Sequence, residues 1–467
     1  MANGKAGRHS AMDETAPGGS AMGEWARSEP AGTAGLGKDR QHYSAFWQRA
    51  AALLAGLPPK PRRAEADAAT AAAILARTRT SRERFLAAYA AAIYDALTQN
   101  RSRFVRLEEL VFAAAEYLPG LTPTREEIAA EDGLLLGEKE GLEVDQGIFL
   151  AHVLADERSG THLCHAMLLP RPEAPELMAR FAADGVLDLG AARLERRGKA
   201  AHLTAANPRF LNAEDWTTLA LMETAVDVAI LDQASGIGVL RGGKVEHPKY
   251  RGRHVLGAGI NLTRLYRGEI PFLFYLERDL GYVHKLLRGV AVPELVPDDV
   301  NGRSVEKPWI AVVDTFAIGG HCQLLLAVDF VLAASDAFMT LPARKEGIIP
   351  GAANLRLPRF TGDRIARQAI QYERRFACDS PEGRLICDEI APPDEMDAAI
   401  ERVVAGLTDS GAVSAVANRR AFRVGQEPLD TFRRYFSAYA REQAYCHFSP
   451  ALISNLERFW NAEQRKV

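Results

Sequence analysis

The sequence lacks the short motifs that mark most cofactor-dependent and nucleophilic enzymes. Neither Gly236–Gly238 nor Gly257–Gly259 is followed by the third glycine of a dinucleotide-binding turn, so a Rossmann cofactor is not expected. There is no phosphate-binding P-loop and no GxSxG nucleophile elbow. None of the eleven histidines begins an HxD or HxE pair that could start a non-haem iron site. We therefore expect no metal and no organic cofactor.

Paired cysteines, excess charge and long apolar runs are also scarce. The five cysteines are scattered singly, without a CxxC pair, as in a reducing compartment. His162, Cys164 and His165 lie together, but their spacing fits no familiar structural zinc site. A net charge of −3 without aromatic-interleaved Lys/Arg stretches argues against nucleic acid as a partner. The longest apolar run, Leu324 to Ala334, is interrupted by Asp329, and the N-terminus has no apolar signal core. We expect a cytoplasmic protein with no membrane contact.

The pattern along the chain divides it into four parts. Residues 1–40 are rich in Gly, Ala and Ser without periodicity, which predicts a disordered tail. Residues 41–190 show helical spacing throughout and predict an all-helical N-terminal domain. From residue 191 to 400, two short strands around Arg197-Gly198, a helix capped by Asn212 and a further strand predict an α/β core. Residues 401–467 are again helical, and we expect them to form an oligomerisation segment.

A buried strand, a glycine turn and a helix are predicted between Lys307 and Asp329. The run Trp309–Val313 is apolar with three β-branched residues, as a strand buried on both faces should be. Gly319 and Gly320 permit a tight turn, and a helix follows immediately. The amide of Gly320 then has no intrahelical partner and lies at the positive end of the helix dipole. It can hold an oxygen that gains negative charge.

A second glycine turn, Gly257–Asn261, precedes a helical stretch from about Ile270 to Leu287. Two turns that each supply an amide to one point form the arrangement that stabilises a thioester carbonyl as it becomes an enolate. Three motifs carry a resemblance: the turn at 257–262, the segment from Lys307 to Asp329, and the turn Ile349–Asn354. In these motifs and in their spacing, the chain from about Ala191 onwards resembles the crotonase (enoyl-CoA hydratase/isomerase) superfamily.

The resemblance implies a fold and an oxyanion site. The implied fold is α/β, a crotonase-like spiral of ββα units that closes into trimers or hexamers, here with an all-helical N-terminal domain and a helical C-terminal segment. The amides of Ile260 and Gly320 would form the oxyanion hole, and Gly259 and Gly319 would line the substrate beside them. The implied substrate is an acyl-CoA thioester.

The departures from the superfamily pattern concern proton transfer. Hydratases of the superfamily use two glutamates, and alignment of the motifs places Gln323 at the first position and Ala343 at the second. Neither side chain can move a proton near neutral pH, so hydration of an enoyl-CoA is not expected. Stabilisation of an enolate needs only the two amides and is retained. A substrate of high intrinsic acidity could do without a strong protein base.

One branch of the superfamily fits these departures. The helical N-terminal extension, Gln323 and the segment Tyr439–Pro450 resemble the dioxygenases of glycopeptide-antibiotic biosynthesis. The resemblance implies that an arylacetyl-CoA reacts with O2 through an enolate. Gln323 could then hold a phenol or peroxide oxygen, since it both donates and accepts. Glu214 could bind a ring hydroxyl or act as base, and Arg278 could anchor a phenolate. For these two the plain alternatives are a helix-dipole partner and a solvated arginine.

Two other functions are compatible with the same motifs. A thioesterase or dehydratase acting on an aryl acyl-CoA would use the oxyanion hole without O2. A non-catalytic protein that binds acyl-CoA would explain why both familiar glutamates are absent. CoA release that does not depend on oxygen would identify the first alternative, and binding without any turnover would identify the second.

Overall fold

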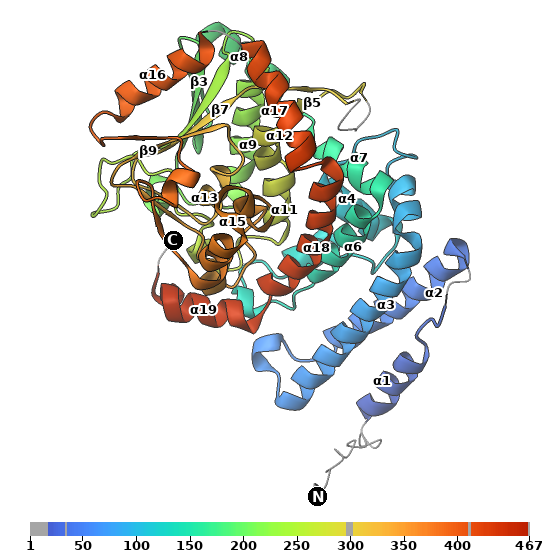
Figure 1. Cartoon of the computed structure of the whole chain (residues 1–467). Coiled ribbons are helices and arrows are strands. Elements are labelled where there is room, and N and C mark those ends of the chain that lie inside the picture. Colours follow the sequence, from blue (N-terminus) through green and yellow to red (C-terminus); the bar gives the residue numbers. More distant parts are fainter. Residues whose placement is uncertain (1–16, 33–34, 296–301, 410–411, 466–467) are drawn as a thin grey trace, which may run out of the picture.

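Helices make up the first part of the structure, a computed structural model that describes residues 17–32, 35–295, 302–409 and 412–465 (Figure 1). They are α1 (Pro17–Arg27), α2 (Leu36–Ala55), α3 (Glu65–Leu97), α4 (Leu107–Tyr117), α5 (Arg125–Ala129), α6 (Val144–Ala155), α7 (Glu157–Leu168) and α8 (Ala174–Asp184). The helices α1 to α3 lie side by side and extend away from the rest of the molecule (Figure 1).

The predicted disordered tail is too long, because α1 begins at Pro17 within it. The ring of Trp25 stacks on Phe46 with 4.9 Å between centroids, and its Nε1 donates to the carbonyl of Phe46 at 3.1 Å. Trp25 is fully buried by this contact. The contact of this single tryptophan with Phe46 orders a Gly/Ala-rich segment whose composition alone predicts disorder. Residues 1–16 lie outside the described residues.

The strands form one large and two small sheets. They are β1 (Val186–Asp188), β2 (Ala192–Arg197), β3 (Ala200–Ala205), β4 (Ile237–Gly242), β5 (Val290–Ala291), β6 (Ser304–Val305), β7 (Trp309–Val313), β8 (Phe316–Ile318), β9 (Phe330–Ala334), β10 (Phe338–Thr340), β11 (Phe376–Ala377) and β12 (Glu389–Ala391). The large sheet has the order β1-β2-β3-β4-β7-β9-β12, antiparallel up to β3 and parallel beyond it. The predicted hairpin around Arg197-Gly198 and the predicted strand Trp309–Val313 are both present.

Successive strands alternate between two sheets before the chain enters a helix. The strand β7 lies in the large sheet, β8 lies in the sheet β11-β10-β8, and α13 (Gly320–Leu324) follows. The strands β9 and β10 repeat this alternation before α14 (Ala343–Glu346). The residues of β7 are all buried, as expected for a central parallel strand with both faces covered. The predicted ββα architecture with a helical N-terminal region is confirmed.

The remaining helices surround this core. They are α9 (Trp216–Leu231), α10 (Leu262–Tyr266), α11 (Leu273–Leu280), α12 (Tyr282–Arg288), α15 (Ala353–Tyr372), α16 (Met396–Thr408), α17 (Ala412–Gln426), α18 (Leu429–His447) and α19 (Pro450–Trp460). The helix predicted from Ile270 to Leu287 is divided at Gly281, where a Cβ would lie 2.3 Å from the carbonyl oxygen of Glu277. Asn212 does not cap α9, which begins after Asp215. Asn212 instead donates from Nδ2 to the carbonyl of Val255 at 2.7 Å.

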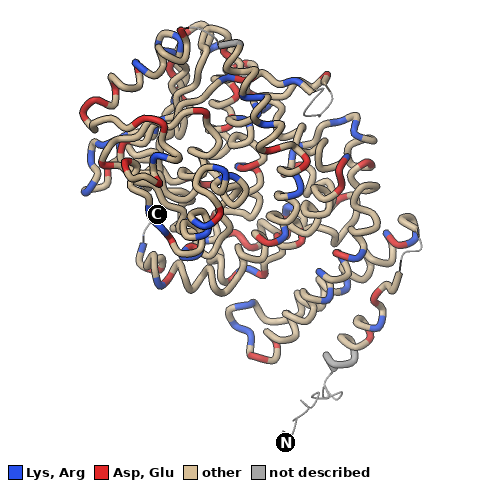
Figure 2. The backbone as a smooth tube through the Cα atoms, viewed as in Figure 1, with Lys and Arg blue, Asp and Glu red and all other residues tan. Residues whose placement is uncertain are grey.

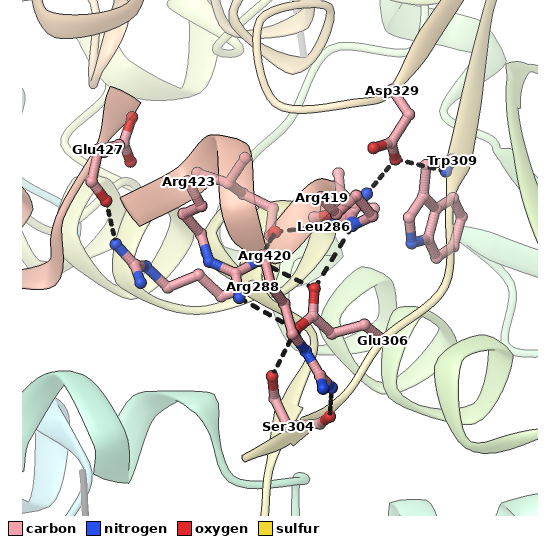
Figure 3. A network of polar contacts seen from close by, with 11 residues as sticks. Leu286, Arg288, Ser304, Glu306, Trp309, Asp329, Arg419, Arg420, Arg423 and Glu427 are labelled. Atoms are coloured by element: carbon pink, nitrogen blue, oxygen red, sulfur yellow. Dashed lines mark hydrogen bonds and ion pairs between the residues drawn. The ribbon is translucent and has the colours of Figure 1, made fainter. Parts of the chain in front are cut away.

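The C-terminal helices are fixed to both halves of the molecule. On α17, three arginines surround the fully buried carboxylate of Glu306, with Arg420 at 2.7 Å and Arg423 at 2.9 Å (Figure 3). Arg419 also donates to the carbonyl of Leu286 at 2.6 Å (Figure 3). The helix α18 packs along α6 in the N-terminal region. This packing brings α18 to the wall of the site described below.

Acidic and basic residues are interspersed over the backbone, and no extended basic stripe is visible in this view (Figure 2). Within the described ranges, we find no helix that combines the length and apolar character needed to cross a bilayer.

Candidate active site

The first glycine turn places Ile260 on the wall of an internal cavity. The backbone around it is fixed on both sides, because the amide of Glu214 donates to the carbonyl of Gly259 at 2.8 Å, and the amide of Asn261 donates to the carbonyl of Glu214 at 2.7 Å. Gly259 has a φ of 80°, which favours glycine. In the described part of the chain, the amide of Ile260 has no acceptor. It is therefore available to a ligand oxygen.

The second glycine turn meets the first. The amide of Gly319 donates to the carbonyl of Thr340 at 2.9 Å, and Gly320 then begins α13. The amide of Gly320 finds no acceptor among the described residues. A Cβ on Gly259 would lie 3.2 Å from this nitrogen, so the two turns are in contact. The structure thus brings together the two amides that the sequence predicts, although α13 has only five residues and adds little dipole.

Glu214 and Arg278 form a buried ion pair beside these amides. The Nε of Arg278 donates to the two carboxylate oxygens of Glu214 at 3.0 and 2.9 Å, and its Nη2 donates to the carbonyl of Gly320 at 2.7 Å. Tyr282 donates its hydroxyl to Glu214 as well. Arg278 is only 3% exposed, so the solvated arginine that its helix face suggests is wrong. Glu214 precedes α9 rather than lying in its first turn, so it is no dipole partner of that helix.

The charge of Glu214 is set by these partners. Burial alone would raise the pKa of its carboxyl, but the attraction of Arg278 and the hydrogen bonds from Arg278 and Tyr282 hold it below the ordinary value. Burial lowers the pKa of His321 to about 4, so this imidazole is neutral near pH 7. Its Nδ1 accepts the amide hydrogen of Gly259 at 3.1 Å. Glu214 is therefore an ionised anchor and a weak base.

Gln323 lies on the same wall and is oriented by Arg278. The Nη1 of Arg278 donates to Oε1 of Gln323 at 3.0 Å, which leaves the amide NH2 of Gln323 as a donor. Gly351 packs tightly here, since a Cβ would lie 2.4 Å from Oε1 of Gln323. Ala343 also lines the cavity, so both positions that the resemblance assigns to the superfamily glutamates lie on its wall. Neither position carries a carboxyl group in this chain.

Three further polar residues of the cavity were not predicted from the sequence. Asp279 lies next to Arg278, and burial raises the pKa of its carboxyl to about 6. Tyr439 on α18 is 3% exposed, and its hydroxyl has no partner among the described residues. Glu346 ends α14, three residues after Ala343. Each residue has a signal in the sequence that could have indicated it. Asp279 is adjacent to Arg278, Tyr439 begins the YAREQAY segment, and Glu346 has the i, i+3 spacing from Ala343.

The cavity is small, with about 30 Å³ of free volume. Its polar wall is described above, and apolar side chains complete it: Phe274, Leu341, Ala343, Ile348 and Ile349. The two free amides can donate to a thioester oxygen, and Arg278 and Gln323 add polar groups to the same cavity wall. Among the described residues, no cluster of three or more His, Cys, Asp or Glu side chains could hold a metal ion.

The chain belongs to the enoyl-CoA hydratase/isomerase family. The sequence model of that family, described as enoyl-CoA hydratase/isomerase, matches residues 300–443. A curated relative, the (3,5-dihydroxyphenyl)acetyl-CoA 1,2-dioxygenase of Amycolatopsis orientalis, is 48% identical over 424 residues. The match covers 91% of this chain and 96% of the relative.

Other relatives match a smaller part. The carnitinyl-CoA dehydratase of Salmonella typhi is 29% identical over 133 residues, which cover 28% of this chain and 51% of the dehydratase. The solved structure of an enoyl-CoA hydratase from Mycobacterium avium subsp. paratuberculosis K-10 is 19% identical with a TM-score of 0.47, and the match covers 58% of this chain and 98% of that one.

Proposed function

We propose that this protein converts (3,5-dihydroxyphenyl)acetyl-CoA and O2 to 3,5-dihydroxyphenylglyoxylate and CoA, without a metal or an organic cofactor. The observation that carries the proposal is the 48% identity to a dioxygenase of that name over 91% of this chain. The cavity supports it, because two free amides face a wall in which Gln323 replaces a catalytic glutamate.

The reaction begins at the methylene between the aryl ring and the thioester. Loss of one α-proton gives an enolate whose oxygen accepts hydrogen bonds from the amides of Ile260 and Gly320. The carbanion delocalises into the phenolic ring and can give one electron to O2. Recombination of the two radicals forms a Cα–O bond and leaves a peroxide anion. Exclusion of water by the bound substrate would keep these charged species away from bulk solvent.

The peroxide then attacks the thioester carbonyl. The new C–O bond forms as the C–S bond breaks, and CoA leaves as the thiolate. Cleavage of the O–O bond with loss of the second α-proton yields the α-keto acid. Both oxygen atoms of O2 remain in the product, and one of the two protons balances the CoA thiol.

Gln323, Glu214 and Arg278 would place the ring and the oxygen. The NH2 group of Gln323 can donate to a phenol or peroxide oxygen without quenching the carbanion. The Glu214–Arg278 pair presents a fixed anion and a fixed cation at 2.9 Å from each other, which suits a ring hydroxyl. Gly259 and Gly319 keep the backbone close enough for the thioester to reach both amides. Hydration is disfavoured because Gln323 and Ala343 carry no transferable proton.

Oxygen consumption and labelling test the proposal. The protein should consume one O2 for each CoA released from (3,5-dihydroxyphenyl)acetyl-CoA. In a mixture of 16O2 and 18O2, the keto acid should carry two new oxygen atoms from the same molecule. CoA release that continues undiminished under strict anaerobiosis would show a thioesterase instead, and tight binding without turnover would show an acyl-CoA-binding protein. Chelators should leave the activity unchanged.

The setting is proposed on the same basis. We place the enzyme in the cytoplasm and in glycopeptide-antibiotic biosynthesis, and we propose a homotrimer or hexamer in which residues 401–467 contribute to assembly. Light scattering would then give a mass of three or six times 51.0 kDa.

A further inference from the structure

The proposed reaction needs a group that accepts the α-proton, and three carboxyls line the cavity. Glu214 is held as an anion by Arg278 and Tyr282, which lower the pKa of its buried carboxyl and make it a weak base. Asp279 lies behind Gly351, where a Cβ would be 2.8 Å from both of its oxygens. Glu346 differs from both, since its carboxylate has no hydrogen bond or ion pair among the described residues.

Glu346 also lies next to the oxyanion turn. A Cβ built on Gly319 would be 3.7 Å from Oε1 and 3.8 Å from Oε2 of Glu346. Gly319 directly precedes the free amide of Gly320, so the carboxylate is close to the thioester position. Ala343, at the place of the second superfamily glutamate, shares the cavity wall with Glu346 one helical turn away. The short helix α14 thus supplies a carboxyl group to the cavity from Glu346, although Ala343 has none.

We propose that Glu346 is the catalytic base of this enzyme, an inference that rests on the proposed function. The Cα–H bond of the bound arylacetyl thioester breaks, and the proton passes to a carboxylate oxygen of Glu346. The electron pair moves into the thioester, where the amides of Ile260 and Gly320 hold the enolate oxygen. Once this proton has left with the CoA thiolate, the same carboxylate can take the second α-proton.

The surroundings of Glu346 suit a base near neutral pH. Burial, and secondly the negative charge of Glu373, raise the pKa of its carboxyl to about 7. Among the described residues, no basic group offsets this shift, since Arg344 lies 4.0 Å from Glu373 and the Lys345 ammonium lies over the ring of Phe459. The titratable and charged groups that share the cavity with Glu346 are Glu214, Tyr275, Arg278, Asp279 and Tyr439, and the charge of Glu346 acts on Tyr275.

Hydrogen exchange without oxygen isolates the proton transfer. Anaerobic protein in D2O is mixed with (3,5-dihydroxyphenyl)acetyl-CoA, and α-deuteration is followed by NMR above the enzyme-free rate. Glu346→Gln should slow this exchange by at least about 100-fold, whereas Glu346→Asp should retain part of it. The exposed Glu116→Gln on α4 is the matched control and should exchange at the wild-type rate. Binding of the thioether analogue without the carbonyl should be equal in all four proteins.

The outcomes separate the two proposals. If the wild type exchanges the α-proton but forms no O2-dependent product, the dioxygenase proposal is overturned and the assignment of Glu346 as the base is kept. Exchange by Glu346→Gln within threefold of wild type, or loss of exchange in Asp279→Asn instead, would overturn the base.

A second variant keeps the test decisive if Glu346→Gln does not fold. Glu373→Gln removes the neighbouring negative charge, so the acid limb of the exchange rate should move to lower pH. If the acid limb stays at the wild-type pH, the assignment is contradicted. A purely structural Glu346 would not set the pH dependence of the exchange rate, so removing the charge of Glu373 would not move it.

Discussion

The Nη1 atom of Arg278 donates a hydrogen bond to Oε1 of Gln323 at 3.0 Å, across 45 residues of sequence. This contact fixes which end of the amide faces the cavity. Arg278 therefore links the ionised anchor Glu214 with a neutral donor, and the polarity of the wall depends on both. The first prediction follows from replacing the neutral donor by a carboxylate.

Gln323→Glu should lower O2-dependent turnover by about 10- to 100-fold. The new carboxylate removes the NH2 donor and places negative charge beside the enolate, which costs transition-state stabilisation. Oxygen uptake at saturating substrate measures the effect, and the exposed Gln426→Glu on α17 serves as control. Unchanged turnover would show that Gln323 does not contact the reacting groups.

Gly320→Ala should reduce kcat by about 100- to 1000-fold, the loss typical of a disabled oxyanion donor. A Cβ at this position would lie 2.7 Å from Oε2 of Glu214 and 3.1 Å from Nη2 of Arg278, so the turn must shift. Gly406→Ala on α16 is the matched control, since a Cβ there meets no atom within 4 Å. It should keep full activity and unfold at an equal or higher temperature. Full activity of Gly320→Ala would place the oxyanion elsewhere.

Local patterns predicted much of the core correctly. The strand Trp309–Val313 has the predicted bounds, because an unbroken β-branched run has few alternatives to a buried strand. The hairpin around Arg197-Gly198 follows from alternation and a turn residue. The glycine turns at Gly259 and Gly320 were also found, since positive φ or close approach leaves a glycine in the sequence.

Long-range contacts account for the failures. The plain alternative of a solvated Arg278 is wrong, because a helix pattern is local, whereas the burial of Arg278 depends on Glu214, 64 residues away. The backbone at the break at Gly281 packs against a residue distant in sequence, since a Cβ there would lie 3.2 Å from Oε1 of Glu223. Glu346 and Tyr439 reach the cavity only once α14 and α18 are packed. For the burial of Arg278 and the break at Gly281, no period or motif within a short window of sequence gives a signal.

Tyr439→Phe should weaken the binding of (3,5-dihydroxyphenyl)acetyl-CoA by about 5- to 10-fold. Its buried hydroxyl lacks a partner in the described structure and lines the cavity, so a ring hydroxyl can complete the hydrogen bond. Phenylacetyl-CoA, which has no ring hydroxyl, should bind both proteins equally in calorimetry. Tyr372→Phe, at a side chain 72% exposed, is the control. Equal loss for both ligands would indicate a packing defect and not a lost hydrogen bond.

Glu427 should make folding stability depend on pH in acid. Burial raises the pKa of its carboxyl, but the attraction of Arg356 and Arg359 and their hydrogen bonds outweigh it and lower the pKa to about 2. A depressed carboxyl pKa stabilises the folded state above the unfolded pKa near 4.5, and this stabilisation is lost as pH falls towards 2. The shift corresponds to roughly 3 kcal/mol of unfolding free energy. Urea unfolding should therefore show a difference between wild type and Glu427→Gln that is constant above pH 5 and shrinks at lower pH, while the exposed Glu401→Gln shows none. A difference independent of pH would mean that Arg356 and Arg359 do not hold the carboxylate in the folded protein.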